Sequence, residues 1–198
     1  MNKRRLKFCG WGYEGDGLTA QEEKLVLDRY AESFGVKGFE RIPAPSPDKV
    51  KLERPRIEVP SRLSDICSTD HYDRLVHTYG KSFPDYVRIY EHNFKNAPDV
   101  VVHAHKEEDI FEVFEWAAKE NAAVIPFGGG SSVVGGVEPA VDESYAATIS
   151  LDVCGFNEIK EIDKTSRSAL MQGGLRCPDL EAGLKPHDLT LRHFPQSF

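Results

Sequence analysis

The stretch "PFGGGSSVVGGVEP", residues 126–139, has the residue types and spacing best suited to chemistry in this sequence. Five of its fourteen residues are glycine, and two serines follow the first three glycines. Successive glycines let a backbone adopt positive φ and approach a ligand closely, so that several N–H groups can converge on one anion. The serine hydroxyls add further donors. The residues that therefore suit a pyrophosphate group are Gly128, Gly129, Gly130, Ser131 and Ser132.

Two familiar phosphate-binding motifs do not describe this loop. The P-loop needs G-x-x-x-x-G-K-[ST], and no lysine follows these glycines. The dinucleotide fingerprint G-x-G-x-x-G fails as well, because counting from Gly128 places Val133 at the last glycine position. A glycine-rich turn without a ligand is the alternative reading. The second pair, Gly135 and Gly136, and the apolar run directly before the loop favour a ligand.

The elements that must position the loop are predicted by changes in residue pattern. Residues 99–105 contain a β-branched run, residues 107–121 repeat apolar residues at helical spacing behind three acidic residues, and residues 123–127 form a second short strand. The loop follows this strand, which gives the order strand, helix, strand, loop. Beyond the loop, strands are expected at 147–152, 156–163, 168–174 and 189–194, with a short helix over 177–187.

The first 95 residues differ in character. Thr19 and Glu22 have capping-box spacing before a helix that should end near Gly35. Two further helices are expected, one after Ser68 or Thr69 and one with Pro84 in its first turn. We therefore predict an α+β protein, with a helical N-terminal region over residues 1–95 and an α/β domain over residues 96–198.

Composition and charge exclude several classes of protein. The chain has 198 residues, 40% of them hydrophobic, and a net charge of −7, which predicts a folded globular protein. No long basic run appears, so no nucleic-acid partner is expected. No stretch reaches the ~20 apolar residues of a membrane span, and no apolar segment follows the basic N-terminus as in a signal peptide. We expect a cytoplasmic protein.

Cysteines and histidines give no sign of a metal site. The cysteines are widely scattered and none forms a C-x-x-C pair, so neither a zinc site nor a disulfide framework is predicted. His103 and His105 alternate on an expected strand and would point to one face. A metal would need a third and a fourth ligand, and none is obvious nearby.

The loop at 126–139 closely resembles the pyrophosphate-binding loop of the FAD-linked oxidases with the vanillyl-alcohol-oxidase fold, also called the PCMH-type FAD domain. The match is strongest to the branch that contains alkyldihydroxyacetonephosphate synthase and its bacterial relatives. It covers nearly the whole chain, with support from "CGWGYEGDGL", "STDHYDRLVHTYGKSFPD", "NAPDVVVHAHKEEDI" and "LTLRHFPQSF". The resemblance therefore implies that residues 96–198 have the fold of the first part of that FAD-binding domain.

The resemblance also implies a set of cofactor-binding residues. The FAD pyrophosphate would be held through the backbone of Pro126, Phe127, Gly128, Gly129, Gly130, Ser131 and Ser132. A second flavin-contacting stretch would begin with Gln196, Ser197 and Phe198. Some members attach FAD through a histidine in the glycine loop, and none is present here, so noncovalent binding is implied. Asp188 stands where the family motif commonly has glycine.

Three functional readings remain open at this point. The branch's reaction exchanges an acyl group on dihydroxyacetone phosphate for a long-chain alcohol, in ether-lipid precursor synthesis. Bacterial relatives suggest an FAD-linked oxidase of hydroxy acids or alcohols instead. In the family, "HFPQSF" continues into segments that carry the catalytic side chains, so a truncated, inactive fragment is the third reading and the catalytic residues are unknown. The implied partners are FAD, a small-molecule or lipid-precursor substrate, and a second copy in a homo-oligomer.

Overall fold

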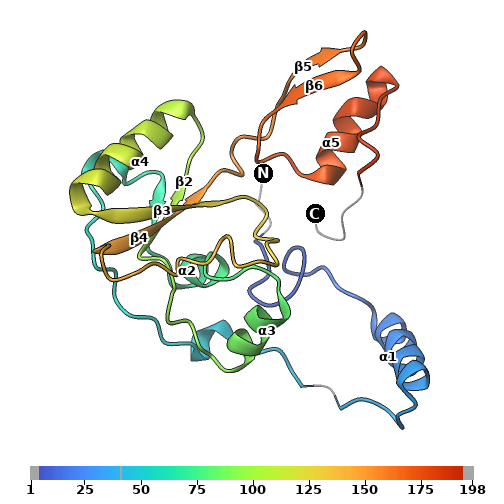
Figure 1. Cartoon of the computed structure of the whole chain (residues 1–198). Coiled ribbons are helices and arrows are strands. Elements are labelled where there is room, and N and C mark those ends of the chain that lie inside the picture. The colour runs from blue at the N-terminus through green and yellow to red at the C-terminus, as the bar shows by residue number, and fades with distance from the viewer. Residues whose placement is uncertain (1–4, 41, 194–198) are drawn as a thin grey trace.

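The centre of the protein is a four-stranded sheet with the order β1-β2-β4-β3 (Figure 1). The computed structural model describes residues 5–40 and 42–193. Strands β2, β4 and β3 are parallel, and the short β1 pairs antiparallel with β2. Strand β4 lies between β2 and β3, and α4 makes the crossover that connects β2 to β3 in the parallel direction. The bounds are β1 (Cys67–Ser68), β2 (Val100–His103), α4 (Glu107–Glu120), β3 (Ala122–Phe127) and β4 (Ala147–Asp152).

Burial explains why these segments form a parallel sheet. Every residue of β4 is buried, and the three valines of β2 have no exposed surface. Strands that are covered on both faces of a sheet have nearly continuous runs of buried residues. One side of α4 supplies Val113, Trp116 and Ala117 to the same core. Phe114, which the helical spacing grouped with the apolar residues, is 51% exposed.

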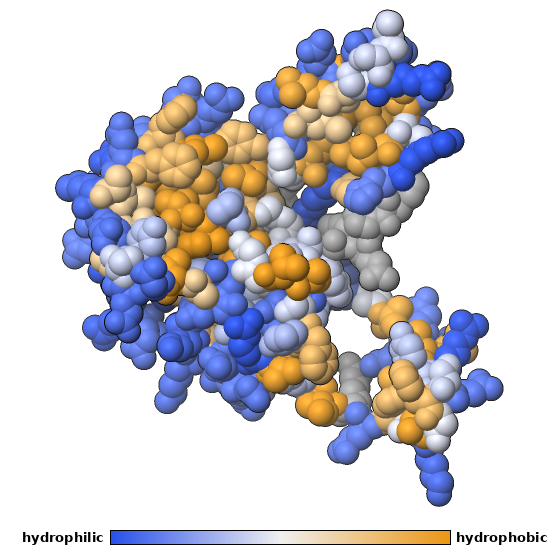
Figure 2. Space-filling model, in the orientation of Figure 1, coloured by the Kyte–Doolittle hydropathy of each residue, from blue (hydrophilic) through white to orange (hydrophobic). Residues whose placement is uncertain are grey.

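The N-terminal region contains the predicted helices. Helix α1 (Ala20–Phe34) begins with the Thr19–Glu22 capping box and ends at Gly35, whose φ is +64°. Helix α1 buries none of its residues and lies apart from the sheet, with apolar side chains gathered on its surface (Figures 1 and 2). Short 3₁₀ turns follow at Pro47–Lys49 and Ser61–Leu63.

Helix α2 (His71–Val76) packs next to β2, and α3 (Phe83–Tyr90) follows it on the side away from the sheet. Asp70 caps α2, and Ser82 with Asp85 forms a capping box at the start of α3. A second hydrophobic cluster joins both helices to the N-terminal segment, through Phe8, Val50, Leu75, Tyr79, Ile89 and Phe94. This cluster fixes the segment between α2 and α3, which contacts the glycine loop.

The C-terminal part contains the antiparallel strands β5 (Ile159–Asp163) and β6 (Ser168–Met171), then α5 (Cys177–Leu184) and a 3₁₀ turn at Lys185–His187. The expected strand at 189–194 is wrong for the described residues, which end at His193. The Leu191 amide and the Thr190 hydroxyl bond to the Glu181 carboxylate, at 2.9 and 2.8 Å. The chain therefore folds back on α5 and has no strand partner there.

The α+β fold class is confirmed, and both sides of residue 96 contribute to the sheet. Strand β1 comes from the N-terminal region, where no strand was predicted. The Asp99 carboxylate accepts hydrogen bonds from Arg56 Nη2 and from the Thr148 amide, both at 2.7 Å. The boundary at residue 96 stays a prediction. Among the helices that the structure describes, none is long and apolar enough to cross a membrane.

Candidate functional site

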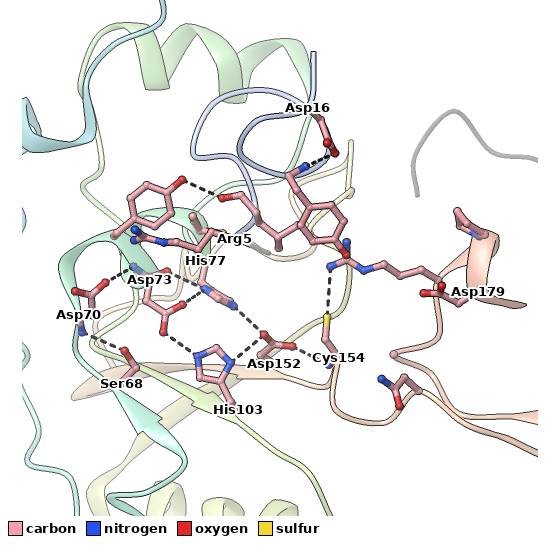
Figure 3. Close-up of a pocket in the computed structure, with 18 residues that line it drawn as sticks. Arg5, Asp16, Ser68, Asp70, Asp73, His77, His103, Asp152, Cys154 and Asp179 are labelled. Carbon is pink, nitrogen blue, oxygen red and sulfur yellow. Dashed lines mark hydrogen bonds and ion pairs between the residues drawn. The ribbon is translucent and has the colours of Figure 1, made fainter. Parts of the chain in front are cut away.

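The carboxyl ends of β2, β3 and β4 meet at one edge of the sheet. Ligands of open parallel sheets bind at this edge. Strand β2 ends at His103, β4 ends at Asp152, and β3 ends at Phe127, directly before the glycine loop as predicted. The loop, the polar residues at the strand ends and a neighbouring cleft together form the candidate site, and Figure 3 shows the residues that line the cleft.

The glycines of the loop have two different roles. Gly130 has a φ of +66°, and a Cβ there would lie 2.5 Å from Cζ of Phe127, so the chain itself requires glycine. Gly128 has no atom within 4 Å of such a Cβ, and Gly129 has only Ser131 Oγ, at 4.0 Å. Neither of these two has a positive φ. The chain does not require glycine at these two positions, so the bare backbone there suits the close approach of a ligand.

The loop also presents its amide groups. None of the backbone N–H groups from Gly128 to Ser132 donates a hydrogen bond to another described residue. The Ser132 hydroxyl oxygen accepts from the Gly136 amide at 3.0 Å and so shapes the turn after the loop. Adjacent amides with no protein acceptor are what a phosphate-binding loop needs. The residues present therefore fit a pyrophosphate group.

The segment between α2 and α3 holds the loop in place. The Lys81 amide donates to the Ser132 carbonyl oxygen at 2.7 Å. A Cβ on Gly80 would lie 2.1 Å from that same oxygen, so only glycine permits this approach. Sequence reasoning did not identify this contact. The one local signal was a glycine three residues before the start of α3.

A ring of two histidines and two aspartates lies beside the loop, at the ends of β2 and β4 (Figure 3). His103 Nδ1 lies 3.1 Å from Asp152 Oδ2, and His103 Nε2 lies 2.8 Å from Asp73 Oδ2. His77 Nε2 lies 3.4 Å from Asp152 Oδ2, and His77 Nδ1 lies 3.3 Å from Asp73 Oδ1. Each imidazole therefore contacts both carboxylates. We call these four residues the His–Asp ring.

The electrostatics of the His–Asp ring favour the charged forms. Hydrogen bonds to Asp152 and Asp73 raise the pKa of His103 to about 9. Burial alone would lower the pKa of His77, but bonds to Asp152 and Asp73 outweigh it and raise that pKa. Burial would raise the pKa of both aspartates, and the bonds from the two histidines lower it instead. Opposite charges at bonding distance explain all four shifts.

The His–Asp ring is connected to the glycine loop through two contacts. The His77 ring packs on the Phe127 ring, with 4.1 Å between centroids. The Asp152 carboxylate accepts from the Cys154 amide at 2.7 Å, and the Cys154 thiol donates to the Gly128 carbonyl oxygen at 3.1 Å. The first two residues of "FGGG" are thus held by His77 of the ring and by Cys154, which the ring orients.

A cleft of about 790 Å³ opens beside the His–Asp ring. Its walls come from the ends of β2 and β4, from the N-terminal hairpin closed by the Leu6–Tyr13 bridge, and from the start of α5. Arg176 lies over the Tyr13 ring at 4.9 Å. Its Nη1 is buried and has no hydrogen-bond partner among the described residues. A polar or anionic ligand group would satisfy that nitrogen.

The structure brings together part of the predicted site. Pro126 through Ser132 form one continuous loop, whereas Gln196, Ser197 and Phe198 lie outside the described residues. His103 enters the His–Asp ring, but β2 ends there and His105 contributes only its backbone, which bonds to Asp109. All four cysteines are free thiols. Among the described residues, no group of three or more His, Cys, Asp or Glu side chains could hold a metal ion.

The parallel sheet and its amide-presenting loop define a protein that binds a phosphorylated nucleotide. Residues 98–198 match the family model described as an FAD binding domain, so the chain belongs to that family and FAD is its cofactor. This confirms the resemblance to the FAD-linked oxidases.

The relatives identify a branch of that family. Alkyldihydroxyacetonephosphate synthase of Dictyostelium discoideum is 37% identical over 136 residues, which are 69% of this chain and 22% of that protein. The synthase of Trypanosoma brucei brucei is 32% identical over 218 residues, covering 98% of this chain and 36% of that protein. A solved structure of an alkyldihydroxyacetonephosphate synthase is similar with a TM-score of 0.78 and 27% identity, over 98% of this chain and 39% of its own.

A more distant relative is named for a different activity. The mitochondrial D-lactate dehydrogenase [cytochrome] of Kluyveromyces lactis is 24% identical over 189 residues, which are 92% of this chain and 31% of that protein. This chain spans less than half the length of each of these four proteins.

Proposed function

We propose that this protein is the flavin-nucleotide-binding part of an enzyme of the alkyldihydroxyacetonephosphate synthase type. Such an enzyme exchanges the acyl group of an acyl-dihydroxyacetone phosphate for a long-chain alcohol, which makes an ether-lipid precursor. The observation that carries the proposal is the similarity to these synthases over almost the whole chain, in sequence and in fold. Cytoplasmic location and self-association into a homo-oligomer belong to the same proposal.

In this proposal the glycine loop binds the pyrophosphate of FAD noncovalently. Pro126 and Phe127 end the strand that aims the loop, and the amides from Gly128 to Ser132 donate to the phosphate oxygens. Gln196, Ser197 and Phe198 begin a second contact to the flavin. The absence of histidine between residues 126 and 139 supports noncovalent binding.

The other residues of the site would orient the loop and exclude water. Bound FAD supplies the redox-active ring, and the protein supplies its position and surroundings. The His–Asp ring holds Phe127 and Cys154, and the Gly80–Lys81 segment holds Ser132 from the opposite end of the loop. We assign this work to two parts of the chain, a helical region over residues 1–95 and a flavin-domain portion over residues 96–198. The family model begins at residue 98, close to that division.

A second candidate function is oxidation of a hydroxy acid or an alcohol. The similarity to a D-lactate dehydrogenase over 92% of the chain favours it. The two functions differ in their overall reaction, because the oxidase reduces flavin and the synthase exchanges groups without net oxidation. Anaerobic mixing with D-lactate or long-chain alcohols, followed by flavin absorbance, distinguishes them: bleaching supports the oxidase and contradicts the synthase.

Flavin binding at the loop is tested with Gly129→Val. A β-branched side chain blocks the close approach of a phosphate, and a Cβ at this position meets only Ser131 Oγ within 4 Å. We expect FAD binding by fluorescence titration to be abolished while the urea midpoint stays within the parent's error. Gly17→Val is the matched control, because a Cβ there meets no atom within 4 Å and its φ, like that of Gly129, is not positive. Equal FAD affinity of Gly129→Val and the parent would remove the loop from the site.

A further inference from the structure

We propose that Lys81 binds the phosphates of FAD from outside the glycine loop and supplies the positive charge that the loop lacks. This inference rests on the proposed function and extends it to a residue in the N-terminal region. The match to the FAD-binding family model covers residues 98–198 and does not include Lys81.

The backbone of Lys81 is fixed against the loop. Its amide donates to the Ser132 carbonyl oxygen at 2.7 Å, and the neighbouring Gly80 approaches that oxygen as only glycine can. On its other side, Ser82 begins α3 through a capping box with Asp85. The lysine side chain therefore leaves a rigid backbone position next to the phosphate-binding amides.

Lys81 lines a small cavity, of about 10 Å³, together with the loop. Lys81, Gly129 and Gly130 all line this cavity. Its other walls are mostly apolar, and they include Leu6, Trp11, Val76 and Phe127. In surroundings of this kind, an interaction between opposite charges is stronger than it is in water.

Lys81 has no carboxylate partner within ion-pair distance among the described residues. Asp85 acts on it electrostatically, but the Asp85 carboxylate already accepts from Arg88 Nη2 at 2.6 Å and from the Ser82 amide at 2.9 Å. Burial lowers the pKa of Lys81, against the opposing charges of Cys9 and Asp85. A partly buried cation without a direct partner is stabilised by an anion.

The negative charge of the ligand also requires a positive group near the loop. The diphosphate of FAD is an anion, and this chain carries a net charge of −7. Residues 126–139 contain Glu138 and no basic residue. The amide dipoles alone would have to balance the negative charge of the phosphates, unless another element of the chain supplies a basic side chain. Lys7 also lines the cavity, but its amide donates to the Gly12 carbonyl oxygen and not to the loop, so Lys81 is the better-positioned lysine.

The test compares three variants of the full chain by titration with FAD, ADP and riboflavin. We expect Lys81→Met to weaken FAD and ADP about 10- to 100-fold, the range for a hydrogen bond to a charged group. Riboflavin, which has no phosphate, should bind the variant as it binds the parent. Lys81→Arg should restore most of the FAD affinity. Lys119→Met, at an exposed position on α4, is the control and should change nothing.

Two further readouts separate a phosphate contact from a structural role. Raising the salt concentration should weaken FAD binding less in Lys81→Met than in the parent, because one screened charge pair is missing. In the parent, FAD or ADP should protect Lys81, and not Lys119, from an amine-reactive reagent, as read by mass spectrometry. This second measurement holds even if Lys81→Met does not fold.

The outcomes distinguish this inference from the proposed function. If Gly129→Val loses FAD and Lys81→Met keeps parental affinity and salt dependence, the loop is the site and the role of Lys81 is refuted. If Lys81→Met loses riboflavin as strongly as FAD, the lysine acts on structure and the inference also fails. If the parent binds no FAD, both proposals fall together.

Discussion

Replacing Gly80 with alanine should destabilise the protein through a single backbone clash. The new Cβ would lie 2.1 Å from the Ser132 carbonyl oxygen and 3.0 Å from its carbon. Both atoms belong to the backbone, so no side chain can swing away. To reach the shortest ordinary contact of 3.4 Å, the two segments must separate by more than 1 Å. That movement breaks the 2.7 Å bond from the Lys81 amide.

The magnitude follows from these two losses. Overpacking costs about 1–3 kcal/mol, and the lost hydrogen bond costs about 0.5–1.5 kcal/mol. We expect the free energy of unfolding to fall by about 2–4 kcal/mol in all. With a urea m-value of roughly 2 kcal/mol/M, the midpoint should fall by about 1–2 M. FAD affinity should fall as well, because the loop loses its support at Ser132.

Urea denaturation monitored by circular dichroism measures this loss of stability, with Gly17→Ala as the matched control. A Cβ on Gly17 has no atom within 4 Å, so the free energy of unfolding of this control should stay within about 0.5 kcal/mol of the parent. Gly129→Ala should likewise keep the parental midpoint and weaken FAD binding alone. A Gly80→Ala midpoint equal to that of Gly17→Ala would show that the two segments move apart freely, and the argument for a rigid loop would fail.

Three further predictions concern the His–Asp ring, the Arg56–Asp99 pair and Asp188. The pKa of His103 is raised to about 9 in the folded protein, so the stability that its charged form contributes is complete below the unfolded value of 6.5 and is lost as pH rises through 9. The urea midpoint should therefore fall over that pH range in the parent and fall less in His103→Gln. Asp99→Ala should lower the free energy of unfolding by about 2–4 kcal/mol in urea titration, because it leaves the Thr148 amide and Arg56 without an acceptor; an unchanged midpoint would contradict this. Asp188 has a φ of +59°, so Asp188→Gly should raise stability by about 0.5–1 kcal/mol, and a lower melting temperature would count against it.

The sequence predicted those elements whose backbone is determined by adjacent residues. The Thr19–Glu22 spacing located the start of α1, and Gly35 located its end. The β-branched run and the glycines located β2 and the loop after β3. In each case a few adjacent residues determine the backbone, through capping, burial or permitted φ.

The parts that sequence reasoning missed depend on contacts between distant residues. His77, His103 and Asp152 meet only because α2, β2 and β4 end at the same edge of the sheet. The Lys81 contact to Ser132 spans fifty-one positions, and no spacing rule connects them. The strand expected at 189–194 failed for a related reason, because the side chain of Glu181 accepts the hydrogen bonds that a neighbouring strand would have taken.

Strand β3 also influences how copies of this protein behave in concentrated solution. It lies at the border of the sheet, with β4 on one side and no other described strand beyond it. An open border of this kind can recruit strands from other molecules and start fibre growth. Pro126 is exposed in β3 and has no N–H to offer to an incoming strand. The residue that leads the chain into the phosphate loop therefore also limits stacking of one molecule on the next.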